Sequence, residues 1–346
     1  MPSALFSLTF VVSHMIIEKN LKRKHMTKAT IATKPGWSKR RKLLTILLIT
    51  LILLLLATLI AIPFGVMPMF LGQRYEQKQH DASEYGMDAK RISLTTDDGL
   101  QLAAWRTHAA KSKGTVIILS GIQNLSVTAF FGYAKMFADN GWDSLLIEMR
   151  ARSQSEGDEI GFGMTEWRDV KAGVDYLSAD APVSNLPIIA MGTSMGAGTV
   201  IIAAGEIPRI DAVISISAFS SWPDLFVDNM AMTGIPKALG IMDIPFLQMY
   251  MGFHFGFEAL AYSPVNGIAK LGDRPILMMH STGDTQVPYR EFESLLDKAK
   301  NKNIDVTTFI REGDEHFICY EQFVKTPTLD VEFSQAILSF LQTMIP

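Results

Sequence analysis

The chain has 346 residues and a mass of 38.3 kDa, which is enough for one large domain with an appendage or for two domains. Hydrophobic residues make up 48% of the chain and charged residues 19%, and this composition excludes a disordered protein. The net charge of −3 does not indicate a nucleic-acid-binding protein, so we predict no nucleic-acid partner. The single cysteine, Cys319, excludes an internal disulfide framework and a cysteine-built metal cluster.

The first part of the chain combines a basic segment with an apolar one. Ten lysines and arginines lie between Lys19 and Lys42, whereas Glu18 is the only acidic residue up to that point. The run from Leu43 to Ile62 has no charged residue, and its three threonines are too few for the polar stripe of a soluble helix. Because about 20 apolar residues span the hydrocarbon core of a bilayer, we predict a transmembrane anchor at 43–62. Residues 1–42 form a basic tail, and residues 63–90 form a linker.

The basic segment sets the orientation that we expect for this anchor. Lys and Arg beside a membrane helix remain on the cytoplasmic side, so the tail should be cytoplasmic and the chain after Pro63 extracytoplasmic. The alternative is a cleaved signal peptide and a secreted domain. Signal peptides have an apolar region of about 7–15 residues and a small-residue cleavage site; this run is longer, and its exit shows no convincing site. Translation from Met26 would still place a basic segment directly before the apolar run, so this criterion allows either Met1 or Met26 as the true start of the protein.

Beyond the linker, short apolar runs alternate with segments of helical periodicity. Asp97-Asp98-Gly99 separates the first two runs and predicts a β-hairpin. Strands that alternate with helices predict an α/β domain over residues 91–346, with a mostly parallel central sheet and helices on both faces. The predicted strands are 91–96, 100–107, 114–121, 143–149, 187–191, 212–217, 275–280 and 305–310. The predicted helices are 128–140, 166–177, 195–205, 289–300 and 330–344.

A G-x-S-x-G motif lies at Gly192-Thr193-Ser194-Met195-Gly196, directly between a predicted strand and a predicted helix. The motif alone recurs by chance, so its context carries the argument. A nucleophile elbow is a sharp strand-to-helix turn that holds the serine in a strained conformation, and small residues let strand and helix pass closely. The helix N-terminus behind the serine directs N–H groups toward developing negative charge. We therefore predict that Ser194 is a catalytic nucleophile; a glycine-rich packing turn is the alternative interpretation.

A serine hydroxyl needs a neighbouring base, which a carboxylate in turn orients. In folds with this elbow, the acid follows the serine in the chain and the histidine follows the acid. Asp284 follows the strand at 275–280, and His316 follows the strand at 305–310. Both therefore lie at the carboxyl ends of strands, where α/β sheets gather ligands. We predict Asp284 as the acid and His316 as the base.

Other histidines and acids fit these roles less well. His280 also lies at a strand end and is the rival base, but it precedes the predicted acid. His254 belongs to an irregular insert, and His108 precedes the first central strand. Glu315 adjoins the predicted base and cannot easily orient it, and Asp273 precedes its strand, which places it at the far edge of the sheet.

Together these segments resemble the α/β-hydrolase superfamily of serine hydrolases, and with the anchor the chain is similar to its single-pass membrane-anchored members. The resemblance extends from about residue 91 to the C-terminus. It rests on the segments TTDDGLQLAAW, VIILSGIQN, LLIEMRARSQSEG, GTSMGAG, YSPVNGIAKLGDRPILMMHSTGDTQVP and EGDEHF. It implies that Ser194, Asp284 and His316 form a catalytic triad, and that the N–H groups of Ile122 and Met195 form the oxyanion hole.

The chain departs from the family's pattern at two places. Ser120-Gly121 stands where the family often has His-Gly, which preserves the glycine and the backbone donor. The loop after the fourth strand often reads D-x-R-G-x-G-x-S, but here Ala151 and Ser153 replace both glycines. Because that loop borders the site in the family, we expect an altered shape there, which bears on the substrate more than on the triad.

The segment between Ser217 and Tyr262 is where the family places a cap over the active site, so we predict a cap insert at about 218–262. Its many methionines and phenylalanines suit an apolar ligand of irregular shape, and packing of the cap onto the sheet is the alternative reason for them.

These features predict a serine hydrolase that cleaves an ester, of carboxylesterase or lipase-like type, with a small-molecule or lipid-like substrate. The alternatives are a serine peptidase or amidase on the same fold, and a non-catalytic binding module that retains the fold. The sequence has no H-E-x-x-H spacing and no G-x-G-x-x-G after a strand, so we predict neither a metal nor a cofactor.

Overall fold

The computed structural model describes residues 37–72, 74, 76–122 and 125–345. The chain divides into two units, one that ends at Leu56 and a compact one from Ala57 to Pro346. Residues 1–36 of the predicted basic tail, with the alternative start at Met26, lie outside the described residues. The predicted anchor and most of the predicted hydrolase domain lie within them.

Helix α2 runs from Lys39 to Leu71 and includes the whole predicted anchor. In the described ranges it is the only helix long and apolar enough to cross a membrane, by criteria of length and composition that a signal sequence also meets. The structure differs from the predicted linker, because the helix does not end at Ile62 but continues through two prolines. Met67 and Leu71 are fully buried, so burial in the compact unit outweighs the cost of these prolines.

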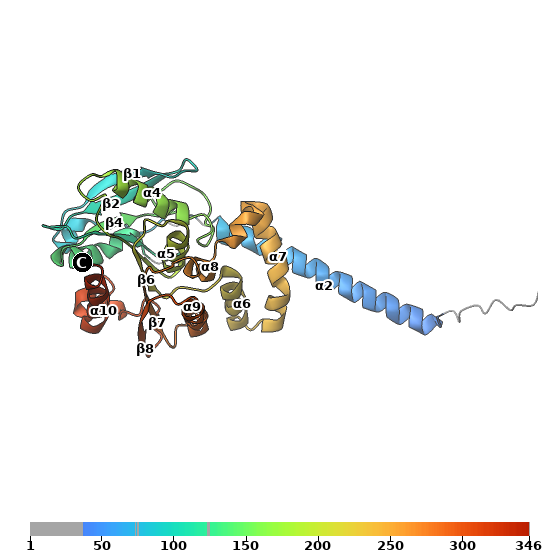
Figure 1. Ribbon diagram of the computed structural model, residues 1–346. Coiled ribbons are helices and arrows are strands. Elements are labelled where there is room, and N and C mark those ends of the chain that lie inside the picture. The colour runs from blue at the N-terminus through green and yellow to red at the C-terminus, as the bar shows by residue number, and fades with distance from the viewer. Residues whose placement is uncertain (1–36, 73, 75, 123–124, 346) are drawn as a thin grey trace, which may run out of the picture. The chain divides into compact units, whose positions relative to one another are not determined.

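An eight-stranded sheet forms the centre of the compact unit (Figure 1). Its strands are β1 (Lys90–Thr95), β2 (Gln101–Thr107), β3 (Thr115–Leu119), β4 (Asp143–Ile147), β5 (Ile188–Thr193), β6 (Ala212–Ile216), β7 (Ile276–Ser281) and β8 (Val306–Arg311). Their order is β1-β2-β4-β3-β5-β6-β7-β8. β2 pairs antiparallel with both β1 and β4, and the remaining pairs are parallel. The predicted hairpin and the mostly parallel sheet are confirmed.

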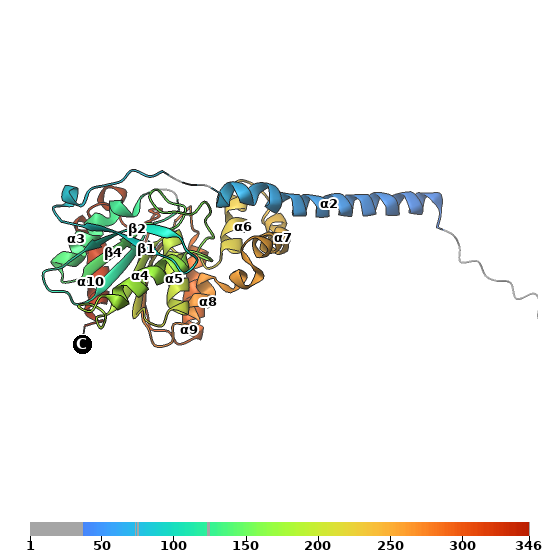
Figure 2. The same cartoon turned by 90° about the horizontal axis from the view of Figure 1, so that it is seen from above.

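Helices cover both faces of this sheet, as predicted (Figures 1 and 2). They are α3 (Phe131–Asp139), α4 (Trp167–Ala179), α5 (Met195–Glu206), α8 (Pro264–Ile268), α9 (Tyr289–Asn301) and α10 (Val331–Gln342). Helices α4, α5 and α9 pack on one set of strand side chains, which includes Ile117 and Ala190. Helices α3 and α10 pack on the alternate set, which includes Ile118 and Met191. The period-two pleat produces this division, and the loops at the carboxyl ends of the strands lie between the two layers.

The predicted cap insert contains two helices and a short turn. They are α6 (Trp222–Met232), α7 (Lys237–Phe255) and the 3₁₀ segment η3 (Phe257–Ala261). Their buried side chains form an apolar cluster of their own, which also includes Met67 and Leu71 of α2. The rings of Phe64 and Tyr250 meet edge-on at 5.1 Å, and both views show the end of α2 beside α6 and α7 (Figures 1 and 2). The last turns of α2 are therefore part of the cap.

Candidate active site

Ser194 lies at the junction of β5 and α5 in a strained backbone conformation. Its φ of 53° and ψ of −120° fall where a residue with a Cβ rarely lies, as an elbow requires. The two glycines of the motif permit the close approach of strand and helix. A Cβ at Gly196 would lie 2.5 Å from the carbonyl oxygen of Ser120, and one at Gly192 would collide with the Gly196 backbone. The local structure predicted for the G-x-S-x-G motif therefore forms.

The predicted acid and base meet across two loops. Asp284 follows β7 and His316 follows β8, and His316 Nδ1 lies 2.7 Å from Asp284 Oδ2. The other carboxylate oxygen accepts the backbone N–H groups of Gln286, at 2.8 Å, and Val287, at 3.0 Å. An ionised carboxylate only accepts hydrogen bonds, so Nδ1 carries the ring proton and Nε2 is left as the acceptor. This is the tautomer in which a histidine acts as a base toward a serine.

Hydrogen bonds to the end of β6 hold the nucleophile and the base at the same place. The Ser194 N–H donates to the carbonyl oxygen of Ile216 at 2.8 Å. The next residue, Ser217, donates its hydroxyl to the carbonyl oxygen of His316. Within the described residues, Ser194 Oγ makes no hydrogen bond to the His316 ring, which is a common state of hydrolases without substrate.

The two predicted oxyanion donors flank the nucleophile. Met195 is the first residue of α5, so its N–H is among those that a helix leaves without an intrahelical partner. Ile122 follows Gly121, and a Cβ added at Gly121 would lie 3.2 Å from the Cβ of Ser194. Nothing in the described part of the chain accepts a hydrogen bond from either N–H. Both N–H groups are therefore free to donate to a ligand, and their role as the oxyanion hole stays a prediction.

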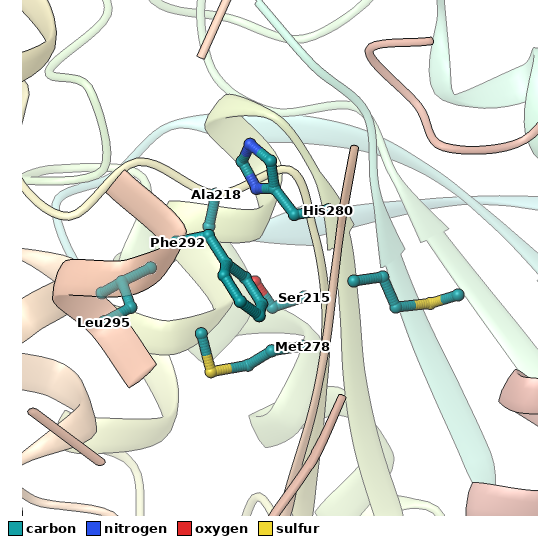
Figure 3. Close-up of a pocket in the computed structure, with 7 residues that line it drawn as sticks. Ser215, Ala218, Met278, His280, Phe292 and Leu295 are labelled. Carbon is teal, nitrogen blue, oxygen red and sulfur yellow. The ribbon is translucent and has the colours of Figure 1, made fainter. Parts of the chain in front are cut away.

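The rival base, His280, is a buried residue with a different environment. Its Nε2–H donates to the carbonyl oxygen of Val287 at 2.9 Å, and its Nδ1 has no partner among the described residues. Burial lowers the pKa of His280, so the ring is held neutral. Figure 3 shows the small recess beside it, which has no room for a water molecule. The recess is lined by Ser215, Ala218, Met278, Met279, Phe292 and Leu295. His280 therefore packs behind the acid, 3.7 Å from Asp284 Oδ2, rather than beside the serine.

The other candidates have partners of their own. His254 of α7 lies 2.6 Å from Glu159, and His108 lies 3.1 Å from Asp143 at the start of β4. The carbonyl oxygen of Glu315 accepts the hydroxyl of Ser281 at 2.7 Å. Asp273 is exposed ahead of β7. The structure brings none of them to the serine.

The loop after β4 keeps the backbone shape that glycines would give. Ala151 has φ of 56° and Ser153 has φ of 31°, so both adopt left-handed conformations despite their side chains. Arg150 supports the loop by bonding to Asp98 at 2.7 Å and to Asp169 at 2.8 Å. The left-handed turns of the loop survive the loss of both glycines.

The segment after α2 is tied to this loop and to the residues beside the oxyanion donors. Arg74 donates to the carbonyl oxygens of Ser153, Ser155 and Gly157 at 2.9–3.1 Å. Gln79 donates to Glu148 Oε2 at 3.3 Å. Burial raises the pKa of Glu148, although this hydrogen bond and one from Ser126 oppose the rise. The segment that follows α2 is thus joined by hydrogen bonds to the loop after β4 and to Glu148.

Two family models cover most of the compact unit between them. The model of the prolyl oligopeptidase family matches residues 161–345, more than half of the chain, and that of X-Pro dipeptidyl-peptidase (S15 family) matches residues 62–240. The chain belongs to the prolyl oligopeptidase family, within the α/β-hydrolase superfamily. The region that this model matches includes Ser194 and the predicted acid and base, and the family is one of serine hydrolases, so the chain is a hydrolase.

This prolyl oligopeptidase family member is also similar to curated relatives and to solved structures. YqkD of Bacillus subtilis (strain 168) is 25% identical over 254 residues, which cover 72% of this chain and 76% of YqkD. YfhR of Salmonella typhi is 23% identical over 274 residues, covering 75% of this chain and 83% of YfhR. The Pyrococcus furiosus esterase Pf2001 superposes with a TM-score of 0.62 at 21% identity, over 79% of this chain and 99% of the esterase. The Pyrococcus horikoshii acylaminoacyl peptidase superposes with a TM-score of 0.56 at 14% identity, over 75% and 42% of the two chains. These superpositions show a shared α/β-hydrolase fold.

Several residues that shape the site lie outside the predicted set. Ser217 bonds to the His316 backbone, and the N–H groups of Gln286 and Val287 hold the acid. The positive φ of Ser217, 57°, depends on its place at the end of β6. None of these contacts has a sequence motif. These contacts form only when the strands are paired, because pairing brings the backbone atoms of separate loops within hydrogen-bonding distance.

Proposed function

We propose that the protein is a carboxylic ester hydrolase with a Ser194-His316-Asp284 triad that works through an acyl-enzyme. The hydrogen-bonded pair of Asp284 and His316, at the same sheet edge as the strained Ser194, is the observation that carries this proposal. A nucleophile, a base and an orienting acid are the parts that acyl transfer to serine requires.

The reaction uses these groups in turn. His316 Nε2 takes the hydroxyl proton as Ser194 Oγ attacks the carbonyl carbon, and the carbonyl electron pair moves onto oxygen. The N–H groups of Ile122 and Met195 stabilise that oxyanion, an effect worth about 10²–10³ in rate per donor. The intermediate collapses, His316 returns the proton to the departing alkoxide, and the acyl group stays on Ser194. A water molecule then attacks the acyl-enzyme carbonyl in the same way, with His316 as the base. The carboxylic acid is released and Ser194 regains its proton.

The cap favours a hydrophobic acyl group. Its apolar cluster brings Phe219, Trp222 and Met251 together with Val287, which lies three residues beyond the triad acid in the chain. Flexible thioethers and aromatic rings suit an acyl chain of irregular shape. The likeness to the P. furiosus esterase supports an ester substrate.

A serine peptidase or amidase is the second candidate. Both matching family models describe peptidases, and one structural neighbour is an acylaminoacyl peptidase. The same triad serves either substrate, because amide and ester hydrolysis share the tetrahedral oxyanion. The choice depends on the cap pocket and not on the catalytic groups.

A paired substrate series separates these candidates. The full chain in detergent is given p-nitrophenyl esters of increasing acyl length and aminoacyl p-nitroanilides. We expect ester turnover that rises with acyl length. Turnover of anilides alone would favour the peptidase, and the absence of both turnover and fluorophosphonate labelling would indicate a binding module.

We also propose that α2 is an uncleaved anchor, with its N-terminus cytoplasmic and the hydrolase domain extracytoplasmic. The four basic residues Lys39–Lys42 at the start of the helix support this orientation, since each costs roughly 2.5–3.5 kcal/mol at the centre of a membrane helix. A reporter that works only outside the cytoplasm, fused after Pro346, should be active. The protein should remain in the membrane fraction after a high-salt wash, whereas release of a shorter soluble form would indicate a cleaved signal.

A further inference from the structure

The outer face of cap helix α7 is mostly apolar, with Gln248 as its exposed polar side chain between Ala238 and Phe253. From Ala238 to Phe253 the only acidic or basic side chain is Asp243, and it is fully buried. Ile241 and Phe253 are 53% and 69% exposed, and Leu239 and Met242 are exposed as well. At 1.5 Å per residue this apolar stretch is about 24 Å long. A surface helix normally carries charged residues on its outer side, so an apolar phase is the expected neighbour of this one.

The exposed apolar side chains of the compact unit are concentrated in this region. They lie on the cap and on the end of α2, at Ile60, Phe64, Met69, Phe70, Met232, Ile235, Leu239, Ile241, Met242, Phe253 and Phe257. Elsewhere in the described part of this unit, the large exposed hydrophobic residues are only Ile310, Tyr320, Leu329 and Val331. These side chains mark a surface on the cap and the end of α2, which also carries exposed polar residues such as Lys237 and Glu258.

Aromatic contacts make that surface continuous across the joint between α2 and the cap. Phe64 of α2 packs edge-on against Tyr250 of α7, and Phe253, one turn further along α7, packs against Phe257 at 5.3 Å. Phe70 lies near Phe226 of α6, with ring centroids 6.4 Å apart. No polar layer separates the two elements at these contacts.

The contact of Phe64 with Tyr250 lies close to the end of the proposed membrane span, and this position along α2 bears on how near the cap lies to the hydrocarbon core. The anchor proposed above ends at Ile62, and Phe64 lies only about 3 Å further along the same helix. Leu59, inside the proposed span, is already buried in the compact unit. The headgroup layer extends about 5–8 Å beyond the hydrocarbon core, so residues that contact Phe64 lie within that layer.

We propose that the outer face of α7, together with the exposed residues of α2 beyond Ile62, is a membrane-contacting surface. It inserts among the headgroups and upper acyl chains of the phospholipid leaflet on the domain's side. This proposal rests on the proposed anchor and is independent of the substrate. Continuity with the anchor favours a bilayer over a second copy of the chain or residues 1–36 as the occupant.

Depth-dependent fluorescence quenching tests this surface. The full chain is reconstituted in phosphatidylcholine–phosphatidylglycerol vesicles, with an environment-sensitive fluorophore on Ile241→Cys or Phe253→Cys. Leu51→Cys in the anchor is the positive control, and Asp297→Cys, exposed on α9, is the matched control. The native Cys319 is buried, and burial raises the pKa of its thiol to about 12, so it remains unlabelled. The quencher is a phospholipid with a nitroxide on its acyl chain.

We expect the labels at 241 and 253 to be blue-shifted and quenched by at least about two-fold, as at 51, while the label at 297 is unaffected. Quenching at 51 without quenching at 241 and 253 would overturn the surface and leave the anchor intact. Absence of quenching at 51 would overturn the anchor and the surface together. Labels on α7 that are shielded from water but not quenched by lipid would assign the face to a protein partner, and would also overturn the proposal.

Discussion

At the scale of single residues, the environments of two histidines separate their roles. His316 bonds through Nδ1 to Asp284 and leaves Nε2 as an acceptor, whereas His280 donates Nε2–H to a backbone carbonyl and its Nδ1 has no partner among the described residues. Both lie at strand ends and both are buried. The hydrogen bonds of the two rings therefore separate the predicted base from the structural histidine. Chain position shows only that His280 precedes Asp284 and that His316 follows it.

Substitution of the two histidines tests this difference. We expect His316→Ala to lower kcat by about 10⁴–10⁶-fold, because members of a triad act as a unit. His280→Ala should lower kcat far less, and its main effect should be on stability, since it leaves a cavity behind Asp284. Steady-state ester hydrolysis, with thermal unfolding of each variant as the control, makes the comparison. The opposite ranking would identify His280 as the base.

Asp243 is a buried carboxyl group, and its ionisation destabilises the folded protein. Both of its oxygens lack hydrogen-bond partners among the described residues, and burial raises its pKa to about 6. The folded protein therefore holds this proton at pH values where the unfolded chain, with a pKa near 3.8, has lost it. Stability must fall as pH rises from about 4 through about 6, because the ionised form is disfavoured only in the folded state.

Asp243→Asn removes the charge and keeps the shape of the side chain. At pH 7.5 we expect the variant to be more stable than the parent, by on the order of 1–3 kcal/mol. At pH 4 the two should converge, because the parent carboxyl is then largely protonated in the folded state. The midpoints of thermal unfolding across this pH range give the answer, and parallel curves for the two proteins would exclude Asp243 as the source.

At the scale of elements, α2 includes the proposed anchor and also packs into the predicted cap. Its turns beyond Ile62 bury Met67 and Leu71 in the apolar cluster of α6 and α7. Hydrogen bonds from Arg74 to the loop after β4 continue the connection toward the site. The end of α2 therefore supports the predicted cap.

Two methionines on the same helix provide a matched test. Met67 is fully buried, and Met69 is 68% exposed. We expect Met67→Ala to destabilise the cap by about 2–4 kcal/mol, the usual cost of truncating a buried methionine. Met69→Ala should change stability by less than about 0.5 kcal/mol. Hydrogen exchange of α6 and α7 in the full chain measures the effect, and equal protection in the two variants would show that α2 does not support the cap.

The sequence was sufficient to predict some elements and not others, for physical reasons. The strands and the elbow were predictable because apolar runs, turn residues and G-x-S-x-G are local signals. The extension of α2 past Pro63 was not, since Met67 and Leu71 stabilise it through residues far along the chain. The left-handed backbone at Ala151 also lacked a signal, because glycine, the residue that normally marks a positive φ, is absent there.

At the scale of the whole molecule, the apolar surface and the site share the cap. The apolar cluster of the cap includes Met67 and Leu71 of α2 and also Val287, in the loop that carries Asp284. Under the proposed function and the proposed membrane contact, a hydrophobic ester in the membrane would meet the cap before it reached the aqueous phase. This arrangement explains why one insert contains both a buried apolar cluster and an exposed apolar face.

Covalent labelling of Ser194 tests the central claim that this family member is an active serine hydrolase. The full chain, in membranes, is treated with a fluorescent fluorophosphonate, and the labelled peptide is identified by mass spectrometry. We predict one labelled site, at Ser194, which disappears in Ser194→Ala while the variant retains the thermal unfolding of the parent. Labelling that persists in Ser194→Ala, or a correctly folded parent that takes no label, would contradict the assignment of this serine as the nucleophile.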